Sequence, residues 1–185
     1  MINYRLFFLF TLLSLCFSAT AQIAQEIRID YQRIQEELSQ YTTKTISVDE
    51  MSAEGGELTG YYKDSILQKI AAVFFGERGK QLMDFYYKDT IPIFIVSTRH
   101  SYNRPMYYTK EMAEEYDDDE YFSSEKTTIT EESFYVQKDS IIIWLNNDGN
   151  PAELEEEEKK MKTQVLISTS QRLQKRLAAL KEEDE

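Results

Sequence analysis

Apolar residues recur at helical spacing in the segment 24–41. Successive members of this apolar set are three or four positions apart, so they form one stripe on a helix, and the opposite side is charged and polar. The stripe consists of Ile27, Tyr31, Ile34, Leu38 and Tyr41. The pattern predicts an amphipathic helix over 24–41. A coiled coil is the alternative, but the seam lasts only two heptads, so we expect the helix to pack on the protein's own sheet.

A six-residue pattern occurs three times in the middle of the chain, at 61–66, 86–91 and 136–141. Each copy has aromatic or β-branched residues, then Lys-Asp-Ser or Lys-Asp-Thr, then an alternating apolar run. Aromatic and β-branched residues favour strands, and Asp followed by Ser or Thr favours a tight turn. The pattern predicts three β-hairpins with the Lys-Asp pair at each tip. A row of charged binding residues is the alternative interpretation, but we favour turn chemistry with the lysines as solvated flanks.

The last third of the chain contains a helix-start signal. Asn150 is a suitable N-cap, Pro151 suits the first helical position, and Glu153 follows three residues after the cap. These residues predict a helix over 151–182. At about 1.5 Å per residue an unbroken helix would be about 48 Å long, so it should overhang the domain or bend near 168–170.

Two further segments separate these elements. A polar connector with a pair of glycines follows the first helix and could hold a short strand at 43–48. The segment 99–128 interrupts the hairpin series, carries seven acidic residues between Glu111 and Glu120, and could hold a short helix at 109–116. A connection this long inside a small domain is typical of a functional or mobile loop.

Together these elements predict an α+β domain. We expect an antiparallel β-meander of about six strands, which form three hairpins within 57–98 and 128–146. We expect the N- and C-terminal helices to pack on one face of this sheet.

The first 21 residues have the pattern of a secretory signal peptide. One basic residue precedes a mostly apolar run at 6–17, and Ala19 and Ala21 supply small residues before a cleavage site. The run is shorter than the roughly 20 residues that span a bilayer, which disfavours a membrane anchor. A lipid anchor on Cys16 is disfavoured because Leu15 precedes it. We therefore expect cleavage after Ala21, a periplasmic or secreted location, one domain over 22–185, and no membrane span in the mature protein.

Composition narrows the possible partners. The chain has 185 residues, with 21 basic and 33 acidic side chains and a formal net charge of −12. Such an excess of acids repels phosphate backbones, so we expect no nucleic-acid partner. Hydrophobic residues make up 42% of the chain, which is typical of a folded domain rather than a disordered one.

No strong catalytic or metal-binding signature is present. The chain lacks a glycine-rich phosphate loop and a nucleophile elbow, and its one Cys lies in the predicted signal peptide. The single histidine, His100, excludes sites that need two imidazoles, and we interpret it as an exposed or capping residue. The run Asp117 to Glu120 could bind Ca²⁺, but consecutive acids diverge and no glycine allows a sharp turn. We expect no catalytic residue, no metal and no cofactor.

The aromatic residues suggest binding instead. Tyr102, Arg104, Tyr107 and Tyr108 form a cluster of Tyr and Arg, the residue types enriched at binding hot spots. The alternative is that these tyrosines cover an open end of the sheet.

Two stretches carry a resemblance. The sequence Gly-Glu-Leu-Thr-Gly-Tyr-Tyr at 56–62 and Tyr-Asn-Arg-Pro-Met-Tyr at 102–107 resemble small exported bacterial proteins of unknown function. The resemblance covers roughly residues 50–146. It implies a Tyr-rich antiparallel sheet bracketed by helices and transfers no catalytic residue.

The functional expectation is therefore an exported, noncatalytic binding or accessory protein. Its partner would be a protein or an envelope polymer. The alternatives are an inhibitor or immunity-type partner of a basic protein, which the negative charge would suit, and a hydrolase that acts on envelope polymers. A pair of carboxylates for such hydrolysis is possible among 33 acids, but with so many candidates it has no specificity.

Overall fold

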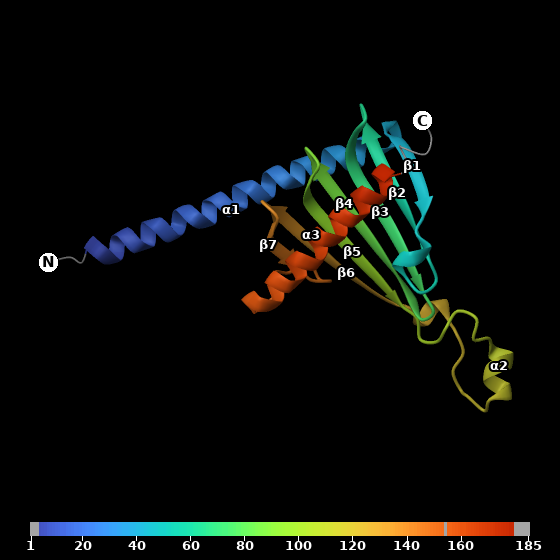
Figure 1. The fold of residues 1–185 in the computed structure, drawn as a ribbon. Coiled ribbons are helices and arrows are strands. Elements are labelled where there is room, and N and C mark those ends of the chain that lie inside the picture. Colours follow the sequence, from blue (N-terminus) through green and yellow to red (C-terminus); the bar gives the residue numbers. More distant parts are fainter. Residues whose placement is uncertain (1–3, 154, 180–185) are drawn as a thin grey trace.

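The fold is one antiparallel sheet with a helix on each side. The computed structural model describes residues 4–153 and 155–179, with side chains described from residue 20 on. The strands lie in the sheet in sequence order, β1 to β7, and each pairs only with its neighbours in the chain (Figure 1). The strands are β1 (Thr42–Ser47), β2 (Gly56–Lys63), β3 (Ile66–Gly76), β4 (Gly79–Lys88), β5 (Ile91–Ser101), β6 (Thr128–Gln137) and β7 (Ser140–Leu145). The helices are α1 (Tyr4–Glu37), α2 (Lys110–Glu115) and α3 (Glu156–Ala179), with short 3₁₀ turns at Leu38–Gln40, Asp49–Met51 and Ser124–Lys126.

The α+β class and the antiparallel meander are confirmed, but the sheet has seven strands rather than six. The extra strand is β1, which pairs with β2 from Thr42 opposite Tyr62 to Ser47 opposite Glu57. It occupies the segment after the first helix where a short strand was possible. Each of the three repeats predicts one hairpin of two strands, so the prediction of about six strands did not include β1.

The hairpin tips are confirmed as turns. Each tip is a two-residue loop in which both residues have positive φ, the backbone of a type I′ turn, which matches the twist of the flanking strands. The loops are Asp64-Ser65, Asp89-Thr90 and Lys138-Asp139. In the third copy the turn falls one residue earlier in the motif, so Ser140 begins β7 instead of closing the turn.

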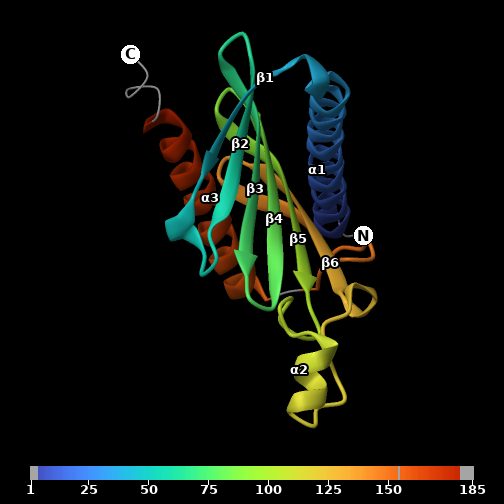
Figure 2. The same cartoon turned by 90° about the vertical axis from the view of Figure 1, so that its right-hand side faces the viewer.

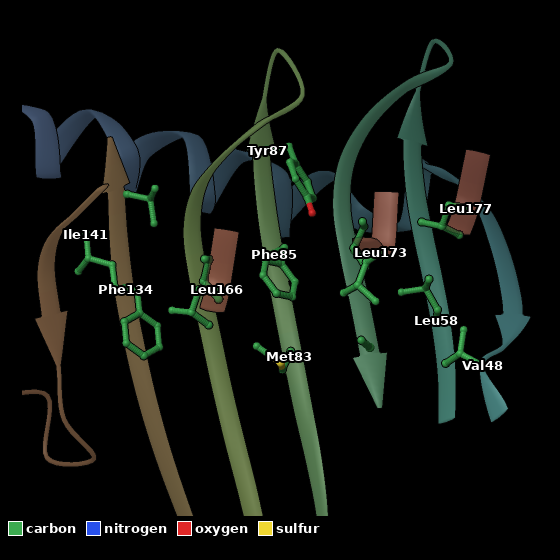
Figure 3. Packing of buried hydrophobic residues seen from close by; sticks show 14 of the residues in the cluster. Val48, Leu58, Met83, Phe85, Tyr87, Phe134, Ile141, Leu166, Leu173 and Leu177 are labelled. Atoms are coloured by element: carbon green, nitrogen blue, oxygen red, sulfur yellow. The ribbon is translucent and has the colours of Figure 1, made fainter. Parts of the chain in front are cut away.

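The two long helices cover opposite faces of the sheet, so the prediction of both on one face is wrong (Figure 2). Helix α3 packs against Leu58, Ile70 and Phe85 through three leucines, and Figure 3 shows this cluster. Helix α1 packs against a separate cluster that contains Tyr86. Successive strand residues point to opposite faces, and both Phe85 and Tyr86 are almost fully buried. Each face therefore has an apolar surface of its own that requires a cover.

The apolar stripe of the first predicted helix is confirmed. Ile27, Ile34 and Tyr41 are buried in the cluster beneath α1, and Tyr31 and Leu38 pack against it. The α-helix ends at Glu37 and continues as a 3₁₀ turn. Its N-terminal part extends away from the sheet (Figure 1). Among the residues whose side chains are described, no helix is both long and apolar enough to cross a membrane.

Two of the repeated lysines hold α1 in place. Lys63 lies 2.8 Å from Glu37, and Lys88 lies 2.9 Å from Asp30. Asp30 and Glu37 are seven residues apart, about two helical turns, so both face the hairpin tips. The hydrogen bond from Lys63 is the main reason that the pKa of the Glu37 carboxyl is lowered. These lysines are therefore more than the solvated flanks predicted, whereas Lys138 is exposed and has no ion-pair partner among the described side chains.

Helix α3 begins later than predicted, at Glu156 rather than at Pro151. Pro151 forms an isolated bridge with Leu145, and the Ala152 N–H donates to the Trp144 carbonyl at 2.9 Å. Pairing with the edge of β7 keeps this segment extended, so Asn150 does not cap the helix. The helix then runs unbroken through 168–170. The predicted end at 182 lies outside the described residues.

Candidate binding site

The candidate site is the insertion between β5 and β6, at the end of the sheet away from the three hairpin tips (Figure 1). Strand β5 extends to Ser101, which pairs with Thr128 at the start of β6. Residues 99–101 and Thr128 therefore belong to the sheet rather than to the insertion. We call residues 102–127 the lobe.

The base of the lobe is fastened by Asn103. Its side-chain amide donates to the Tyr121 carbonyl at 2.9 Å, and its carbonyl oxygen accepts from the Ser123 N–H at 3.1 Å. The ring of Tyr102 meets that of Phe122 edge-on at 5.4 Å between centroids. These contacts join the outgoing and returning arms of the lobe directly above the sheet.

A short helix forms the far end of the lobe. Helix α2 begins after Thr109, whose hydroxyl accepts from the Met112 N–H and so caps the first turn. Ala113 is buried, and its carbonyl accepts from the Asp118 N–H at 2.9 Å, which closes the helix. The helix lies within the segment 109–116 where the sequence suggested one.

Arg104 organises the interior of the lobe. Its guanidinium lies 2.8 Å from a carboxylate oxygen of Asp118 and 5.8 Å from the centroid of the Tyr108 ring. The Tyr108 hydroxyl also donates to Asp118, at 3.3 Å. The backbone N–H of Glu120 is the main cause of the lowered pKa of the Asp118 carboxyl, and Arg104 lowers this pKa further. The acidic run therefore folds back onto Arg104 instead of forming only a solvated loop.

The four residues predicted as a binding cluster are divided by the structure. Tyr102, Arg104 and Tyr108 are partly buried and contact other residues of the lobe. Tyr107 is 58% exposed, and its hydroxyl donates to Glu77 in the turn between β3 and β4. Only Tyr107 of the four presents most of its side chain to solvent.

Other exposed residues of this end were missed by the sequence reasoning. From residue 20 on, only four aromatic side chains are exposed, and all lie in the lobe or on the adjacent end of β3: Phe75, Tyr107, Tyr116 and Tyr121. Met106 is exposed beside them in the chain. Tyr116 and Tyr121 flank the acidic run on either side, and that position was the available signal.

The lobe carries an excess of negative charge, with eight acidic and three basic residues. All three basic side chains pair inside the lobe, Arg104 with Asp118, Lys110 with Glu114 and Lys126 with Glu120. The remaining acids have no ion-pair partner among the described side chains. The lobe therefore presents aromatic side chains together with uncompensated negative charge.

His100 and the acidic side chains that were considered for catalysis or metal binding do not form a site. His100 is on β5, partly buried, with Lys80 and Ile129 as its cross-strand neighbours. In the described part of the chain no three His, Cys, Asp or Glu side chains are grouped closely enough to hold a metal ion.

Comparison with known proteins adds no relative: no family model, no curated protein and no solved structure matches this chain.

Proposed function

We propose that the chain is an exported, noncatalytic binding protein that contacts a partner protein through the lobe. The exposed aromatic side chains Tyr107, Tyr116 and Tyr121 make the contact. Arg104 acts inside the lobe, where it holds the two arms in one conformation. A preorganised surface loses less conformational entropy on binding than a mobile one.

One observation carries this proposal. All four exposed aromatic side chains of the described residues gather at one end of the molecule, and three of them lie on the lobe, which contributes no residue to either core cluster of the sheet. Tyrosine offers a large contact area at low cost in side-chain entropy, which is why it is enriched in binding surfaces. Binding residues also concentrate on loops that a rigid scaffold positions.

Packing against the sheet supports the proposal of export. The described side chains before Ile23 are exposed, and contact with the cluster beneath α1 begins at Ile23 and Ala24. Cleavage after Ala21 would therefore leave the packed part of α1 whole. Intact-mass analysis of protein purified from the producing cells should give the mass of residues 22–185. A mass that retains residues 1–21, or a lipid on Cys16, would contradict the proposal.

Affinity capture from an extract of the cell envelope tests the binding surface. The mature protein should retain a partner that the double variant Tyr107→Ser/Tyr116→Ser does not. The matched control is Ile66→Ser/Ile91→Ser, which removes two equally exposed apolar side chains from the opposite end of the sheet. The control should retain the same partner. Loss of capture by the control alone would place the contact at the hairpin tips.

The charge of the lobe favours one class of partner, a basic protein. Its unpaired acids would attract a positively charged surface, so the chain could act as an inhibitor or immunity-type partner. Rising salt should then slow association more than it speeds dissociation. An association rate that does not change with salt would favour a neutral partner.

A further inference from the structure

A shallow hollow lies at the lobe end of the sheet, where β3, β4 and β5 meet. It measures about 270 Å³, which is just below the lower end of the volumes typical of small-molecule sites. Basic and aromatic residues make up much of its lining, which consists of Phe74, Phe75, Gly76, Arg78, Gly79, Lys80, Gln81, Arg99, His100 and Ser101. The described lining contains no carboxylate side chain.

The basic side chains of this hollow form no ion pairs with the described residues. Among the described residues, Arg78, Lys80 and Arg99 have no ion-pair partner, although the whole chain has an excess of 12 acids. Of these three side chains only Arg78 makes a hydrogen bond within the described residues: an Nη donates to the Asn103 backbone carbonyl at 3.3 Å, which directs Arg78 toward the base of the lobe.

Several carboxylates near the hollow have partners outside its lining. Glu77 accepts from the Tyr107 hydroxyl, Glu131 accepts from Thr98, and Glu132 pairs with Lys162 at 2.7 Å. Glu54 also lies close, since its backbone N–H donates to the Phe75 carbonyl at 3.4 Å. Among the described residues none of these four carboxylates forms an ion pair with Arg78, Lys80 or Arg99.

Two glycines form the floor of the hollow. Gly76 and Gly79 face each other across the turn between β3 and β4, and Gly79 also pairs with Ser101. A Cβ atom at Gly76 would meet only the Gly79 carbonyl oxygen, at 3.6 Å, which is an ordinary van der Waals contact, so an alanine side chain has room there. Strand register places Arg99 beside Gln81 and two residues before Ser101, on the same face of the sheet and at the edge of the hollow.

We propose that this hollow binds one carboxylate or phosphate group of an anionic ligand. Arginine donates two parallel hydrogen bonds to such groups, and Arg78 and Arg99 are the donors. The Ser101 hydroxyl supplies a neutral donor beside them. Phe74 pairs with Gln81, which pairs with Arg99, so Phe74 lies on the face of Arg99 and offers an apolar surface to the rest of the ligand. The lining residues come from β3, β4, β5 and the turn between β3 and β4, so the site does not depend on a partner protein.

Nuclear magnetic resonance titration tests the site with two probes, a trimer of galacturonic acid for carboxylate and glycerol phosphate for phosphate. Saturable shifts of the Gly76, Gly79 and Ser101 amides with either probe support the proposal. The probe that binds more tightly shows whether the natural ligand carries a carboxylate or a phosphate group. Linear shifts without saturation, or shifts spread over the lysines of α3, contradict it.

Two variants separate a built site from diffuse positive charge. Arg99→Ala should weaken binding about tenfold or more, because a charge-assisted hydrogen bond is lost. Gly76→Phe keeps every charge but fills the hollow, and it should weaken binding by a similar factor. Gly76→Ala, for which there is room, and Lys175→Ala on the exposed surface of α3 are the controls and should bind as the unmodified protein does.

Thermal melts of all four variants confirm that each is folded before binding is compared. Unchanged affinity of a folded Gly76→Phe variant would overturn the proposal. So would concentration-dependent dimerisation with no binding of either probe, because the acidic lobe of a second copy would then be the anion that the hollow receives.

Discussion

Lys69 shows how a single charged residue is accommodated inside this fold. Its side chain is only 9% exposed, and its Nζ atom lies 2.9 Å from a carboxylate oxygen of Asp84. The same Nζ atom lies over the rings of Tyr61 and Tyr86, at 5.6 and 5.1 Å from the centroids. Cation–π contact and the ion pair together offset the cost of removing the ammonium from water.

Lys162 repeats this arrangement on the other face of the sheet. It lies 2.7 Å from Glu132, and its Nζ atom lies 5.1 Å from the centroid of the Phe134 ring and 4.9 Å from that of the Trp144 ring. The Trp144 indole N–H also donates to Glu132, at 3.0 Å. Each face thus has one lysine between two aromatic rings, and the one on the face of α3 joins that helix to the sheet.

At the residue scale we predict that Lys69→Ala lowers the free energy of unfolding by about 2–3 kcal/mol. The substitution removes buried packing and leaves Asp84 without its partner. The control is Lys138→Ala, an exposed turn lysine, which should cost less than about 0.5 kcal/mol. Denaturant melts of both variants measure the difference. Equal, small effects would show that the buried pair does not stabilise the fold.

At the scale of elements, the docking of α1 depends on its apolar stripe. Ile34 is fully buried against the sheet, whereas Ile29 on the same helix is 55% exposed. We predict that Ile34→Ala costs about 2–5 kcal/mol, the usual cost of emptying a buried aliphatic site, and that Ile29→Ala costs less than about 0.5 kcal/mol. The comparison removes the same atoms from the same helix. If the two variants melted alike, α1 would not be docked through this face.

The lobe is an element whose order should depend on pH. The Asp118 carboxyl has a lowered pKa in the folded protein. The stabilisation of the lobe by the ionised carboxylate is therefore fully present above the pKa of an unfolded aspartate, about 3.9. That contribution is lost as the pH falls through the lower, folded pKa. We therefore predict that acidification below the unfolded pKa of about 3.9 reduces the exchange protection of the lobe amides of Asp118 and Phe122 before that of β4.

Variants studied at neutral pH test the role of Asp118 in ordering the lobe without the use of acid. Asp118→Ala should reduce protection of the lobe amides, because Arg104 and Tyr108 lose their common acceptor. Asp119→Ala is the matched control, since the Asp119 side chain makes no hydrogen bond or ion pair with any residue that the structure describes. Hydrogen exchange followed by mass spectrometry measures both. Equal protection in the two variants would show that Asp118 does not organise the lobe.

At the scale of the whole molecule, local signals predicted elements well and their assembly less well. The hairpin tips followed from the Lys-Asp-Ser/Thr repeats because a two-residue turn is decided by its own residues. The helix start at Asn150 and Pro151 failed because Pro151 instead forms a bridge with Leu145 at the sheet edge. Tertiary pairing overrode a favourable local cap.

The placement of the helices and the interior of the lobe depend on contacts between distant residues. Consecutive buried residues such as Phe85 and Tyr86 indicate a strand buried on both faces, a signal that the one-face prediction did not use. Arg104 and Asp118 are 14 residues apart, and only the fold of the lobe brings them together. Of the four predicted binding residues, the sequence could not show that three would face inward.

The central claim is that the lobe is the binding surface and that the sheet is its scaffold. Photocrosslinking tests it most directly, with a benzophenone amino acid in place of Tyr107 or Tyr116 in the full chain expressed in its native cells. The controls carry the same amino acid in place of Ile66 or Ile91, at the hairpin tips. We expect a specific crosslinked product from both lobe positions and none from the tips. Crosslinks from the tips alone, with none from the lobe, would contradict it.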